Sequence, residues 1–256
     1  MIYMDITIKA ACGCHIGKIR KNNEDNFYFG GRMLPQDNNG LRTVYTQKFN
    51  SDDIPLFAIF DGMGGEEAGE VASFTAAQIA DDYAQRLKKY LISPREFLVE
   101  MCAEMNRAVC KETAKLEMGR MGSTVAALLF FGDQPYVCNL GDSRIYRFRE
   151  NELLQLSQDH LEFVPPSVKR KARLIQHLGV FEDEMQLEPY VAKGTAQKGD
   201  LFLLCSDGLT DMVSPVEICA ILKETRSEKR AVEKLIKLAL EHGGRDNTTV
   251  ILCEIK

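Results

Sequence analysis

The sequence lacks the features that mark several broad classes of protein. It has no surplus of basic residues, because 32 Lys and Arg face 37 Asp and Glu, for a formal net charge of −5. That balance argues against a nucleic-acid binder that relies on a basic surface. The longest apolar run, VAALLFF after Thr124, is far too short to span a bilayer, and no basic segment with a long apolar stretch opens the chain. We therefore expect a cytoplasmic protein with no nucleic-acid and no membrane partner.

Internal divisions are also missing. No Pro/Ser-rich linker, internal repeat or low-complexity tract interrupts the 256 residues, and that length can bury a substantial core. Hydrophobic residues at 45% and charged residues at 27% are ordinary for a soluble globular protein. We expect one domain over residues 1–256, and a monomer.

The ligands of a zinc site are incomplete. Cys12, Cys14 and His15 lie close together in the sequence, but no second pair of ligands completes a tetrahedral site. The other six cysteines fall inside predicted strands or helices and fit small core residues in a reducing compartment: Cys102, Cys110, Cys138, Cys205, Cys219 and Cys253. Neither GxxxxGK[ST] nor GxGxxG occurs at the glycine-rich segment, which argues against a loop that cradles a nucleotide phosphate.

What the sequence does contain is a set of aspartates at the ends of apolar runs. The runs are IPLFAIFDG, YVCNLGDSR, LFLLCSDGL and GGRDNTTVILCEI, and they carry Asp61, Asp142, Asp207 and Asp246. Buried strands that bring four carboxylates together need a cation to offset the negative charge. A pair of hard divalent metals is the simplest candidate, since such ions prefer oxygen ligands and suit phosphate chemistry when they lie close together.

Capping signals and apolar periodicity predict three long helices and one short helix. Capping boxes at Ser93 and Ser214 each place a proline at the first helical position. Thr225 and Glu228 open the last helix, which Gly243-Gly244 can close. The four helices are expected over residues 66–91, about 94–116, the stretch after Ser214, and the stretch from Glu228 to Gly243.

Six short apolar segments predict strands. They cover residues 54–60, 124–131, 135–140, 144–149, 201–205 and 248–254. Residues 132–135 fit a hairpin turn and Gly141-Asp142-Ser143 fits a turn or bulge, so much of the sheet should be antiparallel. Because long helices come in pairs between groups of strands, we expect an α+β fold rather than a doubly wound parallel sheet: a four-layer αββα sandwich of two mostly antiparallel β-sheets flanked by pairs of antiparallel helices.

Two further segments carry chemistry. In RKNNED, Arg20 lies close to Glu24 and Asp25, and its guanidinium can grip a phosphate with two hydrogen bonds. A solvated charge cluster on an edge strand is the alternative. In DGMGG, glycine allows positive φ and close backbone approach, so the Gly62 carbonyl can turn toward a metal beside Asp61. A glycine-rich strand-to-helix turn without a ligand is the alternative.

The motifs, taken in order, resemble those of one family. From about Gly13 to the C-terminus, RKNNED, FAIFDGMGG, MGSTVAALLF, NLGDSRIYRF, LSQDH, LCSDGLTD and GGRDNTTV resemble the bacterial-type PP2C (PPM) metal-dependent serine/threonine protein phosphatases. The resemblance implies an αββα sandwich with Mn²⁺ or Mg²⁺ between the two sheets. It also implies hydrolysis of phosphoserine and phosphothreonine in phosphorylated protein substrates by a metal-activated water in a binuclear site.

The same resemblance implies a role for each matching residue. Asp61 bridges the two metals, the Gly62 carbonyl binds one, and Asp207 and Asp246 complete the pair. Asp142, together with Asp207, holds a third metal, although a buried turn aspartate that caps backbone amides would look the same in the sequence.

Three more residues serve the substrate and its water. By the resemblance, Arg20 binds the substrate phosphate, while Glu24 and Asp25 hold metal-bound waters. The sequence departs from many family members at Met63, where they carry a histidine proposed as general acid. His160 follows Asp159 in a matching stretch, but a structural histidine is the favoured interpretation there.

Two segments have no assigned role. Residues 160–199 look shorter than the flap of most family members and are basic at Lys169, Arg170, Lys171 and Arg173, which suggests acidic or phosphorylated substrates or simply a solvated helix face. Residues 30–53 look like an elongated hairpin. Two alternatives to a protein phosphatase remain: a catalytically weak regulatory phosphoprotein-binding relative, and a hydrolase of small phosphate esters with the same fold.

Overall fold

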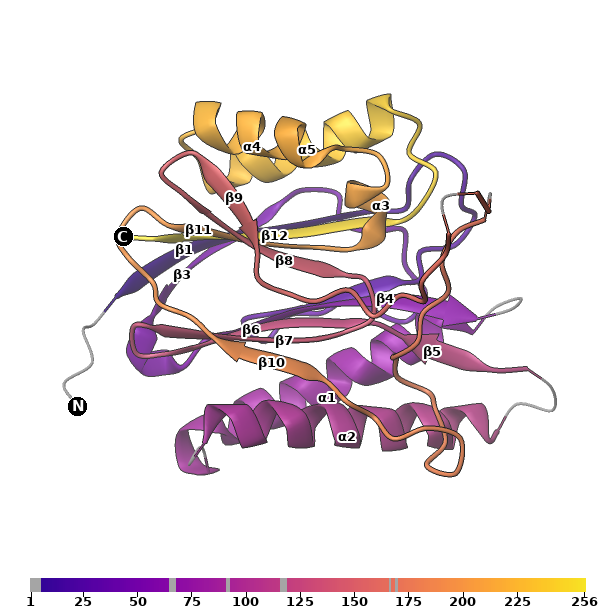
Figure 1. The fold of residues 1–256 in the computed structure, drawn as a ribbon. Helices are drawn as coiled ribbons and strands as arrows, with labels where there is room; N and C mark the ends of the chain where they lie inside the picture. Colours follow the sequence, from indigo (N-terminus) through magenta and orange to yellow (C-terminus); the bar gives the residue numbers. More distant parts are fainter. Residues whose placement is uncertain (1–5, 65–67, 91–92, 116–118, 166, 169) are drawn as a thin grey trace.

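The predicted four-layer sandwich is confirmed (Figure 1). The computed structural model describes residues 6–64, 68–90, 93–115, 119–165, 167–168 and 170–256. Two sheets face each other, and all strand pairs within them are antiparallel. The order of the first, here the β12 sheet, is β3 (Tyr45–Asn50), β1 (Thr7–His15), β12 (Thr248–Ile255), β11 (Leu201–Cys205), β8 (Arg144–Arg149) and β9 (Glu152–Gln155).

The second sheet, here the β4 sheet, carries the first aspartate corner. Its order is β10 (Tyr190–Lys193), β7 (Gln134–Leu140), β6 (Val125–Phe131), β4 (Leu56–Gly64) and β2 (Asp25–Phe29), and the short β5 (Met121–Ser123) pairs with the end of β4. Each of the six predicted strands is present, and all but the end of β4 lie within two residues of the expected bounds. Strand β4 runs on through the Asp61-Gly62 corner instead of stopping before it.

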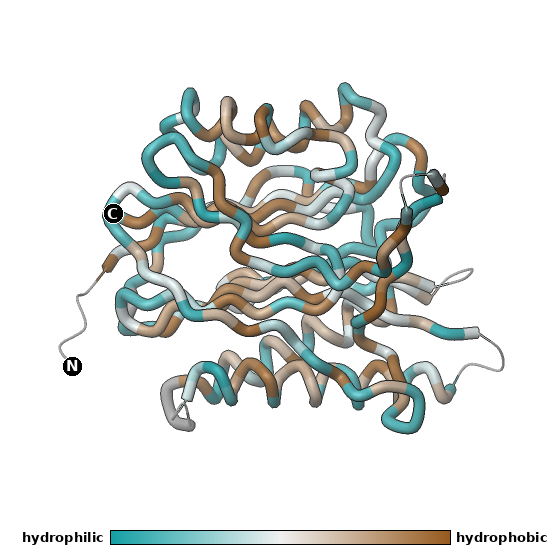
Figure 2. Tube along the Cα trace, in the orientation of Figure 1, coloured by the Kyte–Doolittle hydropathy of each residue, from teal (hydrophilic) through white to brown (hydrophobic). Residues whose placement is uncertain are grey.

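The apolar strands are buried on both faces, which explains their continuous hydrophobic runs. In β4, Phe57 and Ile59 pack between the sheets, while Ala58 and Phe60 face the helices. Aromatic rings cross the inter-sheet core, where Phe130 of β6 meets Phe202 of β11 with ring centroids 5.5 Å apart. Figure 2 shows hydrophobic residues concentrated along the strands of the two sheets. This core fixes the separation of the two sheets.

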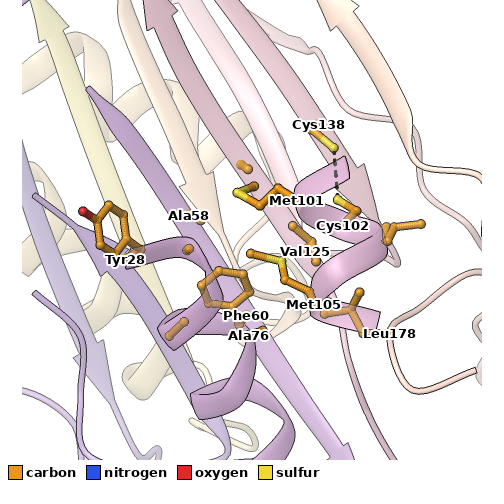
Figure 3. Packing of buried hydrophobic residues seen from close by; sticks show 14 of the residues in the cluster. Tyr28, Ala58, Phe60, Ala76, Met101, Cys102, Met105, Val125, Cys138 and Leu178 are labelled. Atoms are coloured by element: carbon orange, nitrogen blue, oxygen red, sulfur yellow. Dashed lines mark hydrogen bonds between the residues drawn. The ribbon is translucent and has the colours of Figure 1, made fainter. Parts of the chain in front are cut away.

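Helices cover the outer face of each sheet. On the β4 sheet lie α1 (Gly69–Tyr90) and α2 (Pro94–Thr113), and on the β12 sheet lie α4 (Pro215–Glu224) and α5 (Glu228–Glu241) (Figure 1). Figure 3 shows Phe60 packed near Met101 and Met105 of α2. The sulfur atoms of Cys102 and Cys138 lie 3.5 Å apart. None of the helices in the described ranges combines the length and the apolar character that crossing a bilayer requires.

The helix predictions hold with small changes at the ends. Helix α2 begins at Pro94, where the Ser93 hydroxyl accepts from the Glu96 N–H, and the full capping box forms between Ser214 and Glu217. The cap of α5 is Ser227, not Thr225, which instead ends α4. Parts of the predicted ends, residues 66–67, 91 and 116, lie outside the described residues. A short helix that was not predicted, α3 (Asp207–Thr210), starts at Asp207 itself.

Two connections differ from the sequence-based expectation. The predicted hairpin is present, but its turn is only Gly132-Asp133, because Gln134 and Pro135 already belong to β7. Gly141-Asp142-Ser143 carries the chain from β7 in one sheet to β8 in the other. The prediction of an elongated hairpin over residues 30–53 is wrong, because β2 and β3 belong to different sheets. The Asn26 side chain holds the start of this crossing segment by donating to the Leu34 carbonyl at 3.1 Å and accepting from its N–H at 3.0 Å.

Candidate active site

One cleft of about 320 Å³ gathers most of the predicted site residues. It opens where ends of strands from both sheets meet. Its lining includes Arg20, Glu24, Asp61, Gly62, Asp142, Asp207 and Asp246. Of the eight predicted residues, Asp25 alone does not line the cleft. Residues that lie far apart in the sequence therefore meet in one place. The strand-end aspartates lie together there, as expected for carboxylates that share a cation.

The Asp61-Gly62 corner is fixed by three neighbouring backbone segments. The Asp61 N–H donates to the Thr124 hydroxyl at 3.1 Å, and the Asp61 carbonyl accepts from the Thr124 N–H at 2.9 Å. A Cβ added at Gly62 would lie 2.1 Å from the Gly69 carbonyl oxygen and 2.5 Å from that of Glu24. Close backbone approach, not a positive φ, is therefore the reason for glycine at this position.

The second Asp-Gly corner repeats the same device. Asp207 follows β11 and is the first residue of α3. A Cβ added at Gly208 would lie 1.9 Å from the Asn247 carbonyl oxygen, which belongs to the turn that leads into β12. In both Asp-Gly pairs, the glycine therefore lets a second backbone segment pack directly against the residue that follows the carboxylate.

Arg20 reaches across the cleft to the third aspartate. Its guanidinium donates to Asp246 Oδ2 at 2.6 Å, and it lies 3.9 Å from a Glu24 carboxylate oxygen. The Asn247 side chain holds this arrangement together, because it accepts from the Glu24 N–H at 2.8 Å and donates to the carbonyls of Ile16 and Asn22 at 2.9 Å. Sequence reasoning missed Asn247, although it directly follows a predicted ligand.

Asp25 lies behind the cleft. It is 1% exposed, and its Oδ2 accepts from the Ser206 hydroxyl at 2.8 Å and from the Thr249 hydroxyl at 2.6 Å. Burial raises the pKa of Asp25 to about 7, and the two hydroxyls oppose that change. These bonds tie β2 to residues of the opposite sheet next to the Asp207 corner.

Asp142 lies in the turn that crosses between the sheets. Burial, with repulsion from Asp207, raises the pKa of Asp142 to about 6. The turn is braced by His160, whose Nδ1 accepts from the Gly141 N–H at 3.2 Å and whose backbone N–H donates to the Gly141 carbonyl at 3.0 Å. These bonds support a structural role for His160.

The carboxylates raise one another's proton affinity. Burial raises the pKa of Asp61 well above its ordinary value, and Asp207, Asp25 and Asp142 each add to the effect. The pKa of Asp207 is also raised by burial, against the opposing charge of Lys171. Two basic side chains, Arg20 and Lys171, face five carboxylates in the cleft lining. More positive charge is needed if all five are to be ionised at neutral pH.

The donor set fits a hard divalent ion that keeps part of its water shell. Within the described ranges, no three acidic, histidine or cysteine side chains already converge as a complete ligand cage. Arg20 and Lys171 hold carboxylate oxygens of Asp246 and Asp207 at 2.6 and 2.5 Å. Mg²⁺ commonly binds one or two carboxylates with several waters, and Mn²⁺ suits the same oxygen ligands. The zinc alternative at Cys12, Cys14 and His15 gains no ligand from elsewhere in the described chain, and both cysteines are buried.

The comparison with known families decides the assignment. The model of the family described as protein phosphatase 2C matches residues 45–240, more than half of the chain. The chain belongs to this family.

Relatives align with nearly all of this PP2C chain. It is 34% identical over 255 residues to the serine/threonine phosphatase stp of Listeria welshimeri, covering 93% of this chain and 92% of that protein. It is 30% identical over 273 residues to the serine/threonine protein phosphatase PstP of Mycobacterium tuberculosis, covering 100% of this chain and 46% of that protein. A crystal structure of the PstP catalytic domain in complex with 2 manganese ions superposes with a TM-score of 0.76 at 28% identity, covering 98% and 99% of the two chains.

The flap of this PP2C chain differs from the sequence-based expectation. In the described residues between His160 and Gly199 there is a short strand, β10, but no helix. Arg170 pairs with Glu162, and Lys171 pairs with Asp207 and Asp211, while Lys169 lies outside the described residues. Two of the four basic side chains are thus committed to the protein's own carboxylates, which weakens the suggestion that the flap attracts acidic substrates.

Two ion pairs beside the PP2C cleft, those of Lys171 with Asp207 and with Asp211, were not predicted from the sequence. Lys171 lines the cleft, and Asp211 shares its ammonium group with Asp207. Both residues stand in segments noted in the sequence, the basic flap and LCSDGLTD, but no local pattern predicts that they pair. Met63 also lines the cleft and offers no proton to a leaving group. It borders a second hollow of about 670 Å³ as well, which Met121, Ile175 and Val180 help to line.

Proposed function

We propose that this chain hydrolyses phosphoserine and phosphothreonine in protein substrates in a metal-dependent reaction. The observation that carries the proposal is the single cleft in which Arg20 lies among carboxylates from both sheets. Its membership of a family that includes named serine/threonine phosphatases supports the substrate class. A phosphate dianion is complementary to an arginine fork beside a site for divalent cations.

The residues that would hold two metal ions are Asp61, the Gly62 carbonyl, Asp207 and Asp246. The related PstP catalytic domain carries two manganese ions, which supports a pair of Mn²⁺ or Mg²⁺ ions here. Asp142, together with Asp207, is the candidate for a third ion. When bound, such ions activate water as a nucleophile and neutralise charge on the phosphate oxygens.

The remaining groups position the substrate and water. Arg20 can exchange its bond to Asp246 for two bonds to phosphate, because its side chain is 47% exposed. Glu24 would accept hydrogen bonds from water in the cleft, and Asp25 would act through the Ser206 and Thr249 hydroxyls that it holds. Since Met63 cannot donate a proton, the leaving alkoxide takes its proton from water or another group.

Metal removal tests the proposal. With Mn²⁺ present, the protein should hydrolyse both a phosphothreonine peptide and para-nitrophenyl phosphate. A chelator should lower both rates at least about a hundredfold, because it removes the charge that offsets the carboxylates. Adding back Mn²⁺ should restore them. Rates that ignore the chelator would contradict the proposal.

The same assay separates the two rival functions. Hydrolysis of para-nitrophenyl phosphate but of no phosphopeptide would favour a small-ester hydrolase. Binding of phosphopeptide without turnover, at saturating Mn²⁺, would favour a regulatory binding protein.

Replacing Arg20 should weaken substrate binding more than it slows turnover. We expect Arg20→Ala to raise KM for the phosphopeptide about tenfold with a smaller change in kcat, because the guanidinium binds phosphate in the ground state as well. Lys21→Ala is the matched control, since Lys21 is an exposed neighbour of the same charge. An unchanged KM in Arg20→Ala would count against this role.

We also propose one domain, a monomer and a cytoplasmic location. The two sheets share one inter-sheet core, which supports a single domain. All eight cysteines are free, and six are buried, which suits a reducing compartment.

A further inference from the structure

Lys171 places a cation from the chain itself at one side of the metal site. Its Nζ lies 2.5 Å from Asp207 Oδ2 and 3.0 Å from Asp211 Oδ2. Asp207 and Asp211 are four residues apart at the short helix α3, and the Asp211 N–H donates to the Asp207 carbonyl at 2.7 Å. The ammonium therefore bridges two carboxylates that one helical turn presents together.

The loop that carries Lys171 is closed at its base. The Glu162 N–H donates to the Arg173 carbonyl at 2.9 Å, and the Glu162 carboxylate accepts from the Arg173 N–H at 2.7 Å and from the Arg170 guanidinium. Leu161 and Leu174 form an antiparallel bridge beneath it. These bonds join the described residues at the base of the loop, close to Lys171, which lines the cleft.

The base of this loop is also attached to Asp142. His160, one residue before Leu161, makes two hydrogen bonds with Gly141, the residue before Asp142. The His160–Gly141 hydrogen bonds thus connect the loop of Lys171 to the turn of Asp142. Both residues line the cleft with Asp207. The ammonium therefore contacts one predicted ligand of a third metal, Asp207, and lines the cleft together with the other, Asp142.

We propose that Lys171 competes with the third metal ion for Asp207 and Asp142, and so keeps that ion weakly bound while leaving the metal pair in place. An ammonium group and a divalent ion cannot both lie against the same carboxylate oxygen, because their charges repel at that distance. The pair can keep Asp61, the Gly62 carbonyl, Asp246 and the other Asp207 oxygen. This inference rests on the proposed function, since it assumes the metal pair.

Counting bound Mn²⁺ tests the proposal without relying on activity. Chelator-treated, full-length protein would be titrated with Mn²⁺, and free ion followed by electron paramagnetic resonance. Wild type should bind two ions tightly and a third weakly. Lys171→Ala should bind the third about two- to fivefold more tightly, the range expected for removing one partly exposed ion pair, with the first two nearly unchanged.

Three further variants identify the cause. Lys171→Arg keeps the cation and should resemble wild type. Arg173→Ala removes a charge from the same loop but keeps its backbone bond to Glu162, and it should also resemble wild type. Asp142→Ala added to Lys171→Ala should abolish the tightened site. The Lys171 side chain is 60% exposed, so a folded variant is expected, and thermal melting would confirm it.

The outcomes separate this inference from the proposed function. Equal third-ion affinity in wild type and Lys171→Ala would overturn it, as would a tightened site that survives loss of Asp142 or appears equally in Arg173→Ala. Two tight ions with an unaffected third would leave the proposed function standing. Failure of wild type to bind the first two ions would defeat both.

Discussion

Asp61→Asn is expected to lower kcat/KM for a phosphothreonine peptide by about a thousandfold at saturating Mn²⁺, since metal ions supply several kcal/mol to such reactions and each ~1.4 kcal/mol is tenfold. The backbone of Asp61 is bonded through both its N–H and its carbonyl to Thr124. The asparagine should therefore keep its position and lose only the charge.

The same substitution should lower activity but raise stability when no metal is bound. In chelator, burial raises the pKa of Asp61, so the native state holds its proton to a higher pH than the unfolded chain. The ionised carboxylate then costs stability as the pH rises, and removing it should increase the free energy of unfolding at pH 7 by about 1 to 3 kcal/mol. With Mn²⁺ present, the free energy of unfolding of wild type should again exceed that of Asp61→Asn.

Asp37→Asn is the matched control for Asp61→Asn. Asp37 is exposed, and its replacement makes the same change of one charge away from the cleft. Both its kcat/KM and its melting temperature should match wild type. Near-normal turnover by Asp61→Asn, in contrast, would remove Asp61 from the metal site.

Gly62→Ala should damage folding and activity together. The added Cβ would lie 2.1 Å from one carbonyl oxygen and 2.5 Å from another, and neither backbone is a flexible side chain that can turn aside. We expect a loss of about 3 kcal/mol or more in unfolding free energy, at the upper end for overpacked sites. The Gly62 carbonyl must also move, so Mn²⁺ affinity should fall.

Gly194→Ala provides a comparison with the same chemical change. The nearest atom to its added Cβ is Pro135 Cγ at 3.3 Å, so a loss below about 1 kcal/mol is expected from urea denaturation. Wild-type stability and Mn²⁺ affinity in Gly62→Ala would show that the two backbones can separate without cost, and close backbone approach would then not explain the glycine.

The sequence predicts the central strands and the Asp-Gly corners because both signals are local. Strands such as β6 and β12 are buried on both faces and therefore read as unbroken apolar runs. In contrast, β1 and β3 were not predicted, since TIKAACGCH and YTQKFN mix small and polar residues. Their strand conformation depends on pairing with β12 and with each other across long stretches of sequence.

The same distinction applies within the cleft. Arg20, Glu24 and the four aspartates stand in motifs whose order identifies the family, and the structure brings all six to one cleft. Lys171 meets Asp207 from 36 positions away through a loop that has no periodic pattern, so only tertiary structure reveals the contact. The crossing of residues 30–53 between sheets was unpredictable for a related reason, because strand partners are chosen by the packed core.

The division of the metal-binding residues between two sheets has a mechanical consequence. Asp61 belongs to one sheet and Asp207 and Asp246 adjoin strands of the other, and the rings of Phe130 and Phe202 set the gap between them. Metal ions bound by aspartates of both sheets would hold the two sheets together at this edge. The hydrogen bonds of Asp25 to Ser206 and Thr249 already join the sheets beside it. A substitution in the aromatic core, far from the phosphate site, would therefore change the distance between the two sheets at the metal-binding residues. Metal affinity would change with that distance.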